Sequence, residues 1–236
     1  MIPITIYTMA FNEEVILPFF IKHYRNRFTQ CNIVIFDNES TDNTKSIAAN
    51  NNCHIINWST DGQIDDEKMR ILKNTCWKSS ITDWVLVCDP DELFDINEVQ
   101  LKAEELNNNT IIKSKGFNMV NMEDNLDIEN IKYGVRAEMY DKSYLFNKKF
   151  IKEINYNHGA HLSSPEGIIK YSDLTYMLYH YKYISQEFNI DRHRYTLQRL
   201  SNLNIKMGWG SQWHKTNNNI IQEIIENRKI AVKVIE

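Results

Sequence analysis

Residues 84–94, Trp-Val-Leu-Val-Cys-Asp-Pro-Asp-Glu-Leu-Phe, decide the fold of this chain. Five apolar residues, Trp84–Cys88, run without a break and are followed by two aspartates with one proline between them. Such a run is typical of a strand buried on both faces, as the strands of parallel sheets are. Pro90 cannot donate a hydrogen bond to a sheet, so we expect the strand to end there.

Asp89 and Asp91 are predicted to point the same way, because side chains two residues apart share a face of extended backbone. They would then lie beyond the carboxyl end of the strand, where open α/β sheets bind their ligands. Two converging carboxylates repel each other unless a cation lies between them, and their hard oxygens suit Mg²⁺ or Mn²⁺. An acidic turn after a strand is the alternative interpretation, since Asp-x-Asp is a common pattern.

The composition of the 236 residues is that of an ordinary globular protein, with 42% hydrophobic and 25% charged residues. The net charge of −4 offers no surface suited to nucleic acid, so no nucleic-acid partner is expected. No apolar run is long enough to span a membrane, and no secretory signal is recognised, which favours a cytoplasmic location. The four cysteines form no Cys-x-x-Cys pair and are interpreted as reduced thiols.

Strand-like and helix-like segments alternate through residue 95, which predicts βαβ units and a parallel sheet. The expected strands before residue 84 are 3–9, 32–36 and 54–58. Three helices are expected between these strands. The first begins after Asn12 as its N-cap, the second ends at about Asn50, and the third spans 68–79. The later half is less regular, with strands predicted within 111–122, 133–150 and 174–183 and helices within 97–106, 186–203 and 219–235. We therefore expect an α/β fold whose second half is mixed or antiparallel.

Polar motifs follow three of the predicted strands in a fixed order. They are Ala10-Phe11-Asn12-Glu13-Glu14, Asp37-Asn38-Glu39-Ser40-Thr41-Asp42 and Asp89-Pro90-Asp91. Together they resemble the GT-A glycosyltransferases of family 2, which carry Ala-Tyr-Asn-Glu-Glu, Asp-Asp-Gly-Ser-Thr-Asp and a metal-binding Asp-x-Asp. Lys73-Asn74 stands where that family often has Arg-Asn, 15 residues before Asp89. The resemblance covers residues 3–95 and implies a GT-A fold.

This resemblance also implies roles for individual residues. The residues expected to bind the nucleotide are Met9, Ala10, Phe11, Asn12, Asp37, Asn38, Arg70 and Asp89. Those expected to bind the metal are Asp89, Asp91 and His180, with His161 as the competing histidine. A catalytic base is expected among Glu123, Asp124 and His161, if the transfer inverts the sugar. Because Asn38 can donate as well as accept a hydrogen bond, the nucleobase that the donor carries stays open.

The function implied is a glycosyltransferase that depends on Mn²⁺ or Mg²⁺ and moves a hexosyl or N-acetylhexosaminyl group. Its donor would be a nucleoside diphosphate sugar, with UDP expected, and its acceptor a glycan, protein or small molecule. We expect a single domain over residues 1–236. It would comprise a nucleotide-binding half (1–95), a half that completes the acceptor and metal sites (96–185) and a helical appendage (186–236).

Two other functions fit parts of the same pattern. A non-catalytic relic of the fold would bind a nucleotide sugar or a partner without turnover. A magnesium-dependent phosphatase also begins with a strand ending in Asp-x-Asp, but it needs Thr or Val soon after the second aspartate, where this chain has Glu92-Leu93. A dinucleotide-binding dehydrogenase is excluded, because no Gly-x-Gly-x-x-Gly follows the first strand.

Overall fold

The first four strands of the sheet are formed by the predicted apolar runs. In the computed structural model, which describes all 236 residues, they are β1 (Ile4–Ala10), β2 (Cys31–Asp37), β3 (His54–Asn57) and β4 (Trp84–Val87). All four are parallel, in the order β4-β1-β2-β3. Every residue of β1 and of β4 is buried, as expected for strands covered on both faces. The parallel sheet predicted for this half is confirmed.

The connecting helices are α1 (Leu17–Arg27), α2 (Thr44–Asn50) and α3 (Asp66–Thr75), followed by the 3₁₀ turn η1 (Cys76–Ser79). The prediction that Asn12 caps the first helix is wrong. Asn12 has a left-handed φ of 53°, and its Oδ1 accepts a hydrogen bond from the Thr41 N–H at 2.8 Å. Its side chain therefore ties the end of β1 to the loop after β2, and α1 begins five residues later.

The second half adds mostly short strands. They are β5 (Glu92–Phe94), β6 (Ile111–Val120), β7 (Tyr133–Arg136), β8 (Leu145–Asn147), β9 (Ile151–Glu153), β10 (Glu166–Gly167) and β11 (Tyr171–Tyr183), with α4 at Glu98–Leu106. β7 and β8 pair antiparallel with β6, as predicted for this region, and β8 also pairs with β4. β8 thus joins the two halves into one mixed sheet. The long β11 runs parallel to β6 and antiparallel to β5.

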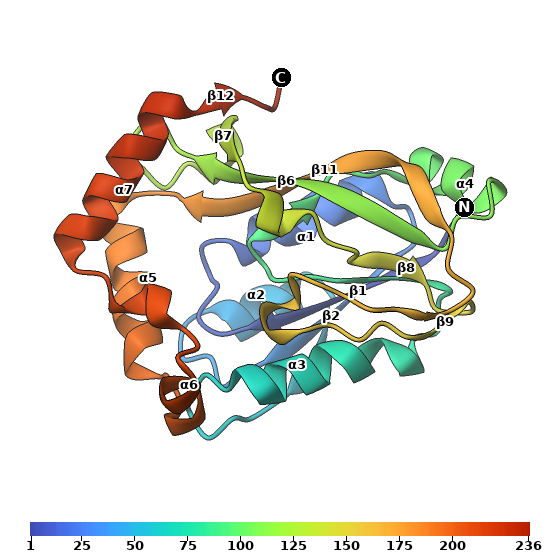
Figure 1. Cartoon of the computed structure of the whole chain (residues 1–236), viewed down its shortest axis with the longest axis horizontal. Coiled ribbons are helices and arrows are strands. Elements are labelled where there is room, and N and C mark those ends of the chain that lie inside the picture. The colour runs from blue at the N-terminus through green and yellow to red at the C-terminus, as the bar shows by residue number, and fades with distance from the viewer.

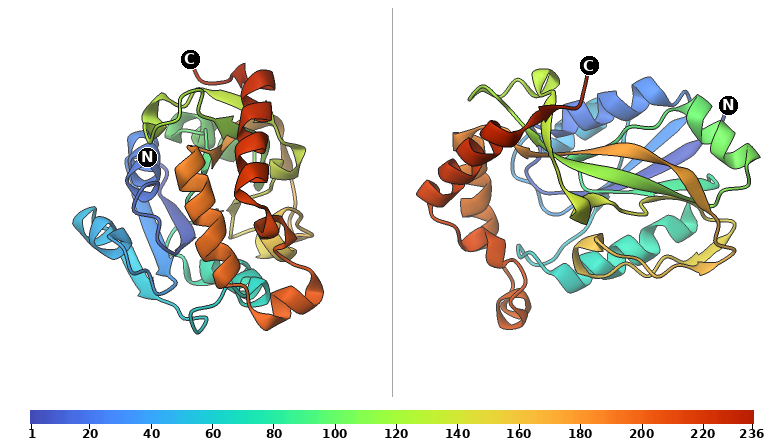
Figure 2. Two further views of the ribbon diagram at one scale, coloured as in Figure 1. Left: turned by 90° about the vertical axis from the view of Figure 1, so that its left-hand side faces the viewer. Right: turned by 45° about the horizontal axis from the view of Figure 1, so that its top comes forward.

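The C-terminal segment comprises α5 (Gln186–Gln198), α6 (Asn202–Met207), α7 (Asn217–Ile230) and β12 (Val232–Lys233). Its helices gather at the end of the sheet where the parallel strands finish (Figure 1). Turned by 90°, the molecule shows α5 and α7 lying side by side across that end (Figure 2). The last helix is shorter than predicted, because the backbone turns extended at Ala231 and β12 then pairs with β7.

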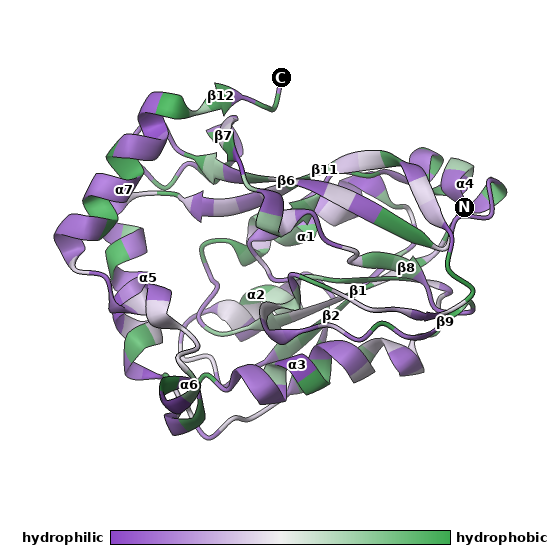
Figure 3. Cartoon of the chain, in the orientation of Figure 1, coloured by the Kyte–Doolittle hydropathy of each residue, from purple (hydrophilic) through white to green (hydrophobic).

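A single cluster of 45 buried hydrophobic residues draws on both halves of the sheet. The outer helices α3 and α7 carry many hydrophilic residues, while β1 and β2 are largely hydrophobic (Figure 3). None of the helices combines the length and the apolar character that crossing a bilayer requires. The core thus holds the carboxyl ends of β1, β2 and β4 at one edge, facing α5.

Candidate active site

The Asp89-Pro90-Asp91 segment forms a turn rather than the end of a strand. β4 ends at Val87, and the Glu92 N–H donates to the Asp89 carbonyl oxygen at 3.0 Å before β5 begins. Because the backbone is not extended here, the prediction that the two aspartate side chains point the same way is wrong. The Asp89 carboxylate lies 2.7 Å from Lys73 Nζ, whereas that of Asp91 faces His180 and Arg192.

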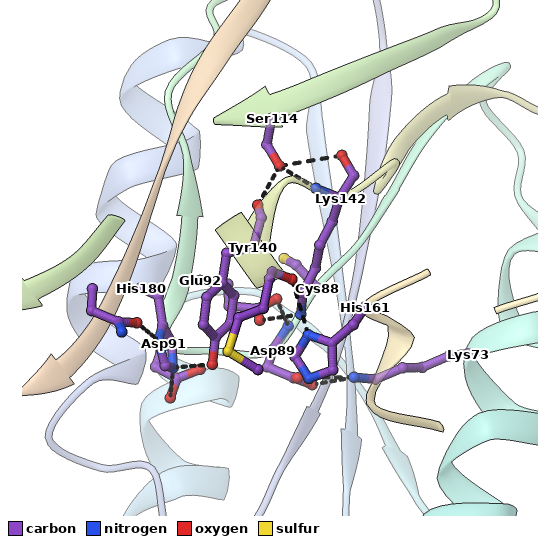
Figure 4. Close-up of polar contacts among 12 residues, drawn as sticks. Lys73, Cys88, Asp89, Asp91, Glu92, Ser114, Tyr140, Lys142, His161 and His180 are labelled. Carbon is purple, nitrogen blue, oxygen red and sulfur yellow. Dashed lines mark hydrogen bonds and ion pairs between the residues drawn. The ribbon is translucent and has the colours of Figure 1, made fainter. Parts of the chain in front are cut away.

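Strand β11 brings His180 to Asp91. The antiparallel register pairs His180 with Glu92, and the Tyr181 N–H donates to the Asp91 carbonyl oxygen at 2.8 Å. His180 Nε2 then lies 3.5 Å from Asp91 Oδ2, and the two side chains lie side by side in Figure 4. On the other side of the ring, His180 Nδ1 lies 2.7 Å from Asn118 Oδ1. An amide oxygen only accepts, so Nδ1 donates its proton to Asn118, while Nε2 faces both Asp91 and the Tyr140 hydroxyl, 3.3 Å away.

Each carboxylate of this region has a cationic partner from the chain itself. Lys73 from α3 pairs with Asp89, and Arg192 from α5 lies 3.0 Å from Asp91 Oδ2. Burial by itself would raise the pKa of Asp91, but Arg192 and His180 hold that pKa well below its usual value. Asp91 is therefore ionised throughout the physiological range.

Glu92 and Lys142 form the most deeply buried ion pair, at 2.7 Å, with side chains only 2% and 1% exposed. Burial raises the pKa of Glu92 and lowers the pKa of Lys142, and the attraction between the two charges opposes both shifts. The Lys142 ammonium lies between the rings of Tyr140 and Tyr144, 4.6 and 4.5 Å from their centroids. The aromatic faces thus supply part of the solvation that burial removes.

Asp37, at the end of β2, is 2% exposed and partly unpaired. Its Oδ2 accepts from the Ser40 N–H at 3.2 Å and lies 3.3 Å from Lys45 Nζ, while its Oδ1 has no hydrogen-bond partner. A pocket of about 410 Å³ opens beside it, lined by Asp37, Glu39, Lys45, Asn57, Trp58 and Ser59. An unpaired buried oxygen is costly, which makes Asp37 a strong acceptor for a ligand that donates.

The residues Phe11 and Asn38, at the ends of β1 and β2, are covered by α5. The Arg199 guanidinium lies 3.2 Å from the centroid of the Phe11 ring and donates to Asn38 Oδ1 at 2.6 Å. Arg192, Tyr195 and Arg199 share one helix face, because they are spaced by three and four residues. None of the three was predicted to have a functional role, although their spacing within a predicted helix is a signal that singles them out.

The sequence matches the model of a known protein family, described as glycosyl transferase family 2, over residues 5–163. The chain belongs to glycosyl transferase family 2. A search among curated proteins gives no match. The matched residues contain β1 to β4, the Asp-Pro-Asp turn and His161, so the family 2 match includes the first two strand-end motifs as well as the third.

Solved structures that resemble this chain include one from S. aureus and one from Mycobacterium tuberculosis. TarS residues 1–349 from S. aureus are 15% identical, with a TM-score of 0.45, covering 82% of this chain and 63% of that one. Glucosyl-3-phosphoglycerate synthase from Mycobacterium tuberculosis, solved with Mn²⁺ and UDP, is 18% identical, with a TM-score of 0.34, covering 49% of this chain and 44% of that one. This family 2 chain thus spans less than two thirds of either structure.

Several residues predicted for the family 2 site lie apart from the charged residues around the turn, which are Asp89, Asp91, Glu92, Lys73, Lys142 and Arg192. Met9 and Ala10 are buried at the end of β1, and Arg70 pairs with Glu67 at 2.6 Å on α3. Glu123 and Asp124 are exposed in the loop after β6. Asp124 Oδ1 accepts from the Gln186 N–H at 2.8 Å, and no hydrogen bond or ion pair joins this loop to Asp91.

His161, by contrast, lies next to Asp89 and the Lys142 ammonium (Figure 4). Its Nδ1 donates to the Met139 carbonyl oxygen at 3.1 Å, which leaves Nε2 as an acceptor. Burial, assisted by the charge of Lys142, lowers the pKa of His161 to about 4. His161 is therefore neutral near pH 7, with Nε2 unprotonated.

Glu13 is a further buried carboxylate that the sequence analysis placed in a helix. It lies before α1, with its side chain 3.2 Å from Arg192, and is 8% exposed. Burial raises its pKa to about 7; Arg192 opposes this shift, and Asp91, Asp89 and Asp42 add to it. Glu13 thus prefers the protonated form more strongly in the folded chain than in the unfolded one.

The variant Glu13→Gln is expected to change how stability depends on pH. Because the folded pKa lies above the unfolded value, the wild type loses stability as pH rises from about 4.5 to about 7, by roughly 3 kcal/mol. Glutamine does not titrate, so the free energy of unfolding of the variant, relative to wild type, should rise across this window. Urea unfolding at pH 4.5 and pH 8 measures the change, and an equal difference at both pH values would refute it.

Proposed function

We propose that this protein transfers a sugar from a nucleoside diphosphate sugar to an acceptor, using a divalent cation held by Asp91 and His180. The observation that carries the proposal is the Asp91–His180 pair at the carboxyl edge of the sheet. No three His, Cys, Asp or Glu side chains converge as a metal site. Two protein ligands nevertheless fit Mn²⁺ or Mg²⁺ when diphosphate oxygens complete the coordination.

The chemistry of His180 also fits a metal ligand. Metal-binding histidines commonly donate their other ring N–H to an oxygen, and His180 donates to Asn118 in this way. Asp91 Oδ2 and His180 Nε2 lie 3.5 Å apart at the same edge of the sheet, and a carboxylate oxygen and an imidazole nitrogen are both ligands that Mn²⁺ accepts. When bound there, the cation neutralises charge on the diphosphate that leaves the sugar. Asp89 remains a predicted ligand, and its carboxylate is held by Lys73.

The nucleotide is proposed to lie along the ends of β1 and β2. Asp37 supports this arrangement, because its unpaired Oδ1 accepts a hydrogen bond from a base N–H or a ribose hydroxyl. UDP is the nucleotide proposed first, and it is also the one bound in the S. aureus TarS structure with UDP and in the mycobacterial synthase. Met9, Ala10, Phe11 and Asn38 would contact it from the strand ends.

His161 is proposed as the base that activates the acceptor hydroxyl. Its Nε2, which forms no hydrogen bond within the chain, and its place beside Asp89 support this role over Glu123 and Asp124, which lie in an exposed loop. The proton of the hydroxyl would pass to Nε2 as the oxygen bonds to the sugar carbon and the bond from that carbon to the diphosphate oxygen breaks. The second half of the chain would determine which sugar and which acceptor the enzyme uses.

Thermal unfolding in the presence of nucleotide sugars tests the proposed function. UDP, GDP and dTDP sugars, each with Mn²⁺, are screened for a rise in the melting temperature, and at least the UDP sugars are expected to raise it by several degrees. Slow hydrolysis of the same sugar nucleotide, dependent on Mn²⁺, would distinguish an enzyme from a non-catalytic binder. Absence of both stabilisation and hydrolysis for all three nucleotides would contradict the proposal.

A further inference from the structure

Arg192 is a buried cation that bridges two carboxylates at the proposed donor site. One guanidinium nitrogen, Nη2, lies 3.0 Å from Asp91 Oδ2 and 3.2 Å from Glu13 Oε1. Its side chain is only 17% exposed, so these contacts are not a solvated surface pair of little energetic weight. Arg192 comes from α5, outside residues 5–163 that match the family, and Asp91 comes from the turn after β4.

The oxygen that Arg192 contacts is the one that faces His180. Asp91 Oδ2 has the guanidinium at 3.0 Å and the imidazole Nε2 at 3.5 Å. A divalent cation held by these two ligands would come within a few ångströms of a fixed positive charge, where repulsion is strong in a buried site. Arg192 and a bound cation therefore compete for the same carboxylate oxygen.

Arg192 differs from the two nearby lysines because it has a second carboxylate partner. Lys73 and Lys142 are each tied to one carboxylate, Asp89 and Glu92, and neither contacts Asp91. Arg192 holds Glu13 as well, so it keeps one anchor at the sheet edge after it releases Asp91. Its planar group, freed on one side, matches the oxygens of a phosphate.

The way α5 is held makes such a small movement feasible. Only Asn189 and Thr196 are buried on this helix, and Phe188 is the one of its residues that packs in part against the main core. Besides the packing of Tyr195 and Arg199 on the Phe11 ring, the contacts of α5 with the strand ends are polar, through Arg192 to Glu13 and Asp91 and through Arg199 to Asn38. Exchanging one polar partner for another therefore disrupts little packing.

We infer that Arg192 binds the nucleotide sugar by exchanging one ion-pair partner for another. In the free protein Arg192 neutralises Asp91. When the divalent cation binds Asp91, Arg192 moves away from it and pairs with the diphosphate of the nucleotide. This inference rests on the proposed function, because it presupposes a cation and a diphosphate at this edge. No bond is made or broken in the exchange. One guanidinium moves from a carboxylate to a phosphate, and the charge at Asp91 stays compensated throughout.

Arg192→Gln tests the exchange, because it should move two affinities in opposite directions. Without nucleotide, Mn²⁺ binding to the variant, measured by electron paramagnetic resonance, is expected to tighten by about tenfold as the competing charge is lost. UDP binding in saturating Mn²⁺, measured by calorimetry, is expected to weaken by at least about tenfold as a charged contact is lost. Uridine, which has no phosphate, should bind both proteins equally.

Arg194→Gln is the matched control, since Arg194 lies on the same helix, is 62% exposed and pairs only with Asp191. It should leave the Mn²⁺, UDP and uridine affinities unchanged. Arg192→Lys provides a second test if the glutamine variant does not fold. Lysine keeps the charge but not the planar fork, so Mn²⁺ binding should stay close to wild type while UDP binding weakens severalfold.

The inference is overturned if Mn²⁺ binding is unchanged or weaker in Arg192→Gln, or if UDP binding is unchanged in both Arg192 variants. If the role of Arg192 is purely structural, its replacement should weaken the binding of Mn²⁺, UDP and uridine together. If the wild type binds UDP with Mn²⁺ but the opposite shifts do not occur, the inference fails and the proposed function stands. If the wild type binds neither ligand, both fail.

Discussion

Asp91→Asn is expected to lower the rate of sugar transfer by about 10²–10³-fold. Asp91 is the one carboxylate that faces His180, and the asparagine amide has the same shape but no charge to hold a divalent cation. The loss should fall mainly on kcat, because the charge matters most when the diphosphate leaves. Initial rates of donor hydrolysis or transfer at saturating Mn²⁺ measure the effect.

The control for this substitution is Asp191→Asn, which changes an aspartate that is 54% exposed and pairs with Arg194. Its rate should equal that of the wild type. A rate within threefold of wild type for Asp91→Asn would show that the cation is held elsewhere or is not needed. Circular dichroism of both variants verifies that the fold is kept, so that a loss of rate is a property of the site.

Lys142→Met is expected to destabilise the fold by about 3–5 kcal/mol, because it leaves the Glu92 carboxylate buried without its partner. Glu92 is 2% exposed and accepts a further hydrogen bond only from the Asp89 N–H, at 3.3 Å. Protonation of Glu92 offsets part of the loss, so the destabilisation should be larger at pH 8 than at pH 5. Equilibrium unfolding in urea at both pH values gives the free energies.

Two further variants separate the charge from the packing. Lys115→Met changes an exposed lysine on β6 and should alter the free energy of unfolding by less than about 0.5 kcal/mol. The double variant Lys142→Met/Glu92→Met replaces the ion pair by apolar side chains and should recover most of the loss. A cost below about 1 kcal/mol for Lys142→Met alone would contradict the account of this buried pair.

The first half of the fold could be predicted because its signals are local. β4 is a continuous apolar run and β1 is apolar except for Thr5 and Thr8, as is typical of strands buried on both faces. The parallel order followed from alternation with helices. Helix starts were less accurate: Asn12 is a good N-cap by residue type, but its side chain bonds to Thr41, 29 residues away, and α1 begins at Leu17 instead.

The site could be predicted only where a motif marks it. Asp91 and His180 were named from the sequence, yet what brings them together is the register of β11 against β5, which no local pattern encodes. Lys142 was not assigned a role, because a lysine in a short strand-like region is ordinarily exposed. Its burial depends on Glu92, 50 residues earlier in the chain, and on two tyrosine rings.

The turn at Asp89-Pro90-Asp91 was interpreted as extended backbone, and this led to the wrong relative orientation of its carboxylates. The sequence does not reveal that Lys73 takes one of them and Arg192 the other. Both cations reach the turn from helices, one preceding it and one about 100 residues after it. Long-range pairing of this kind depends on the completed fold.

The central claim is that a nucleoside diphosphate binds at the carboxyl edge of the sheet through a divalent cation on Asp91. Calorimetric titration of UDP into wild-type protein and into Asp91→Asn, each with Mn²⁺ and with chelator, tests it most directly. Wild type is expected to bind UDP at least about tenfold more tightly with Mn²⁺ than with chelator, and Asp91→Asn is expected to lose this gain. Equal UDP affinity in all four titrations, or a Mn²⁺ gain that survives in Asp91→Asn, would contradict it.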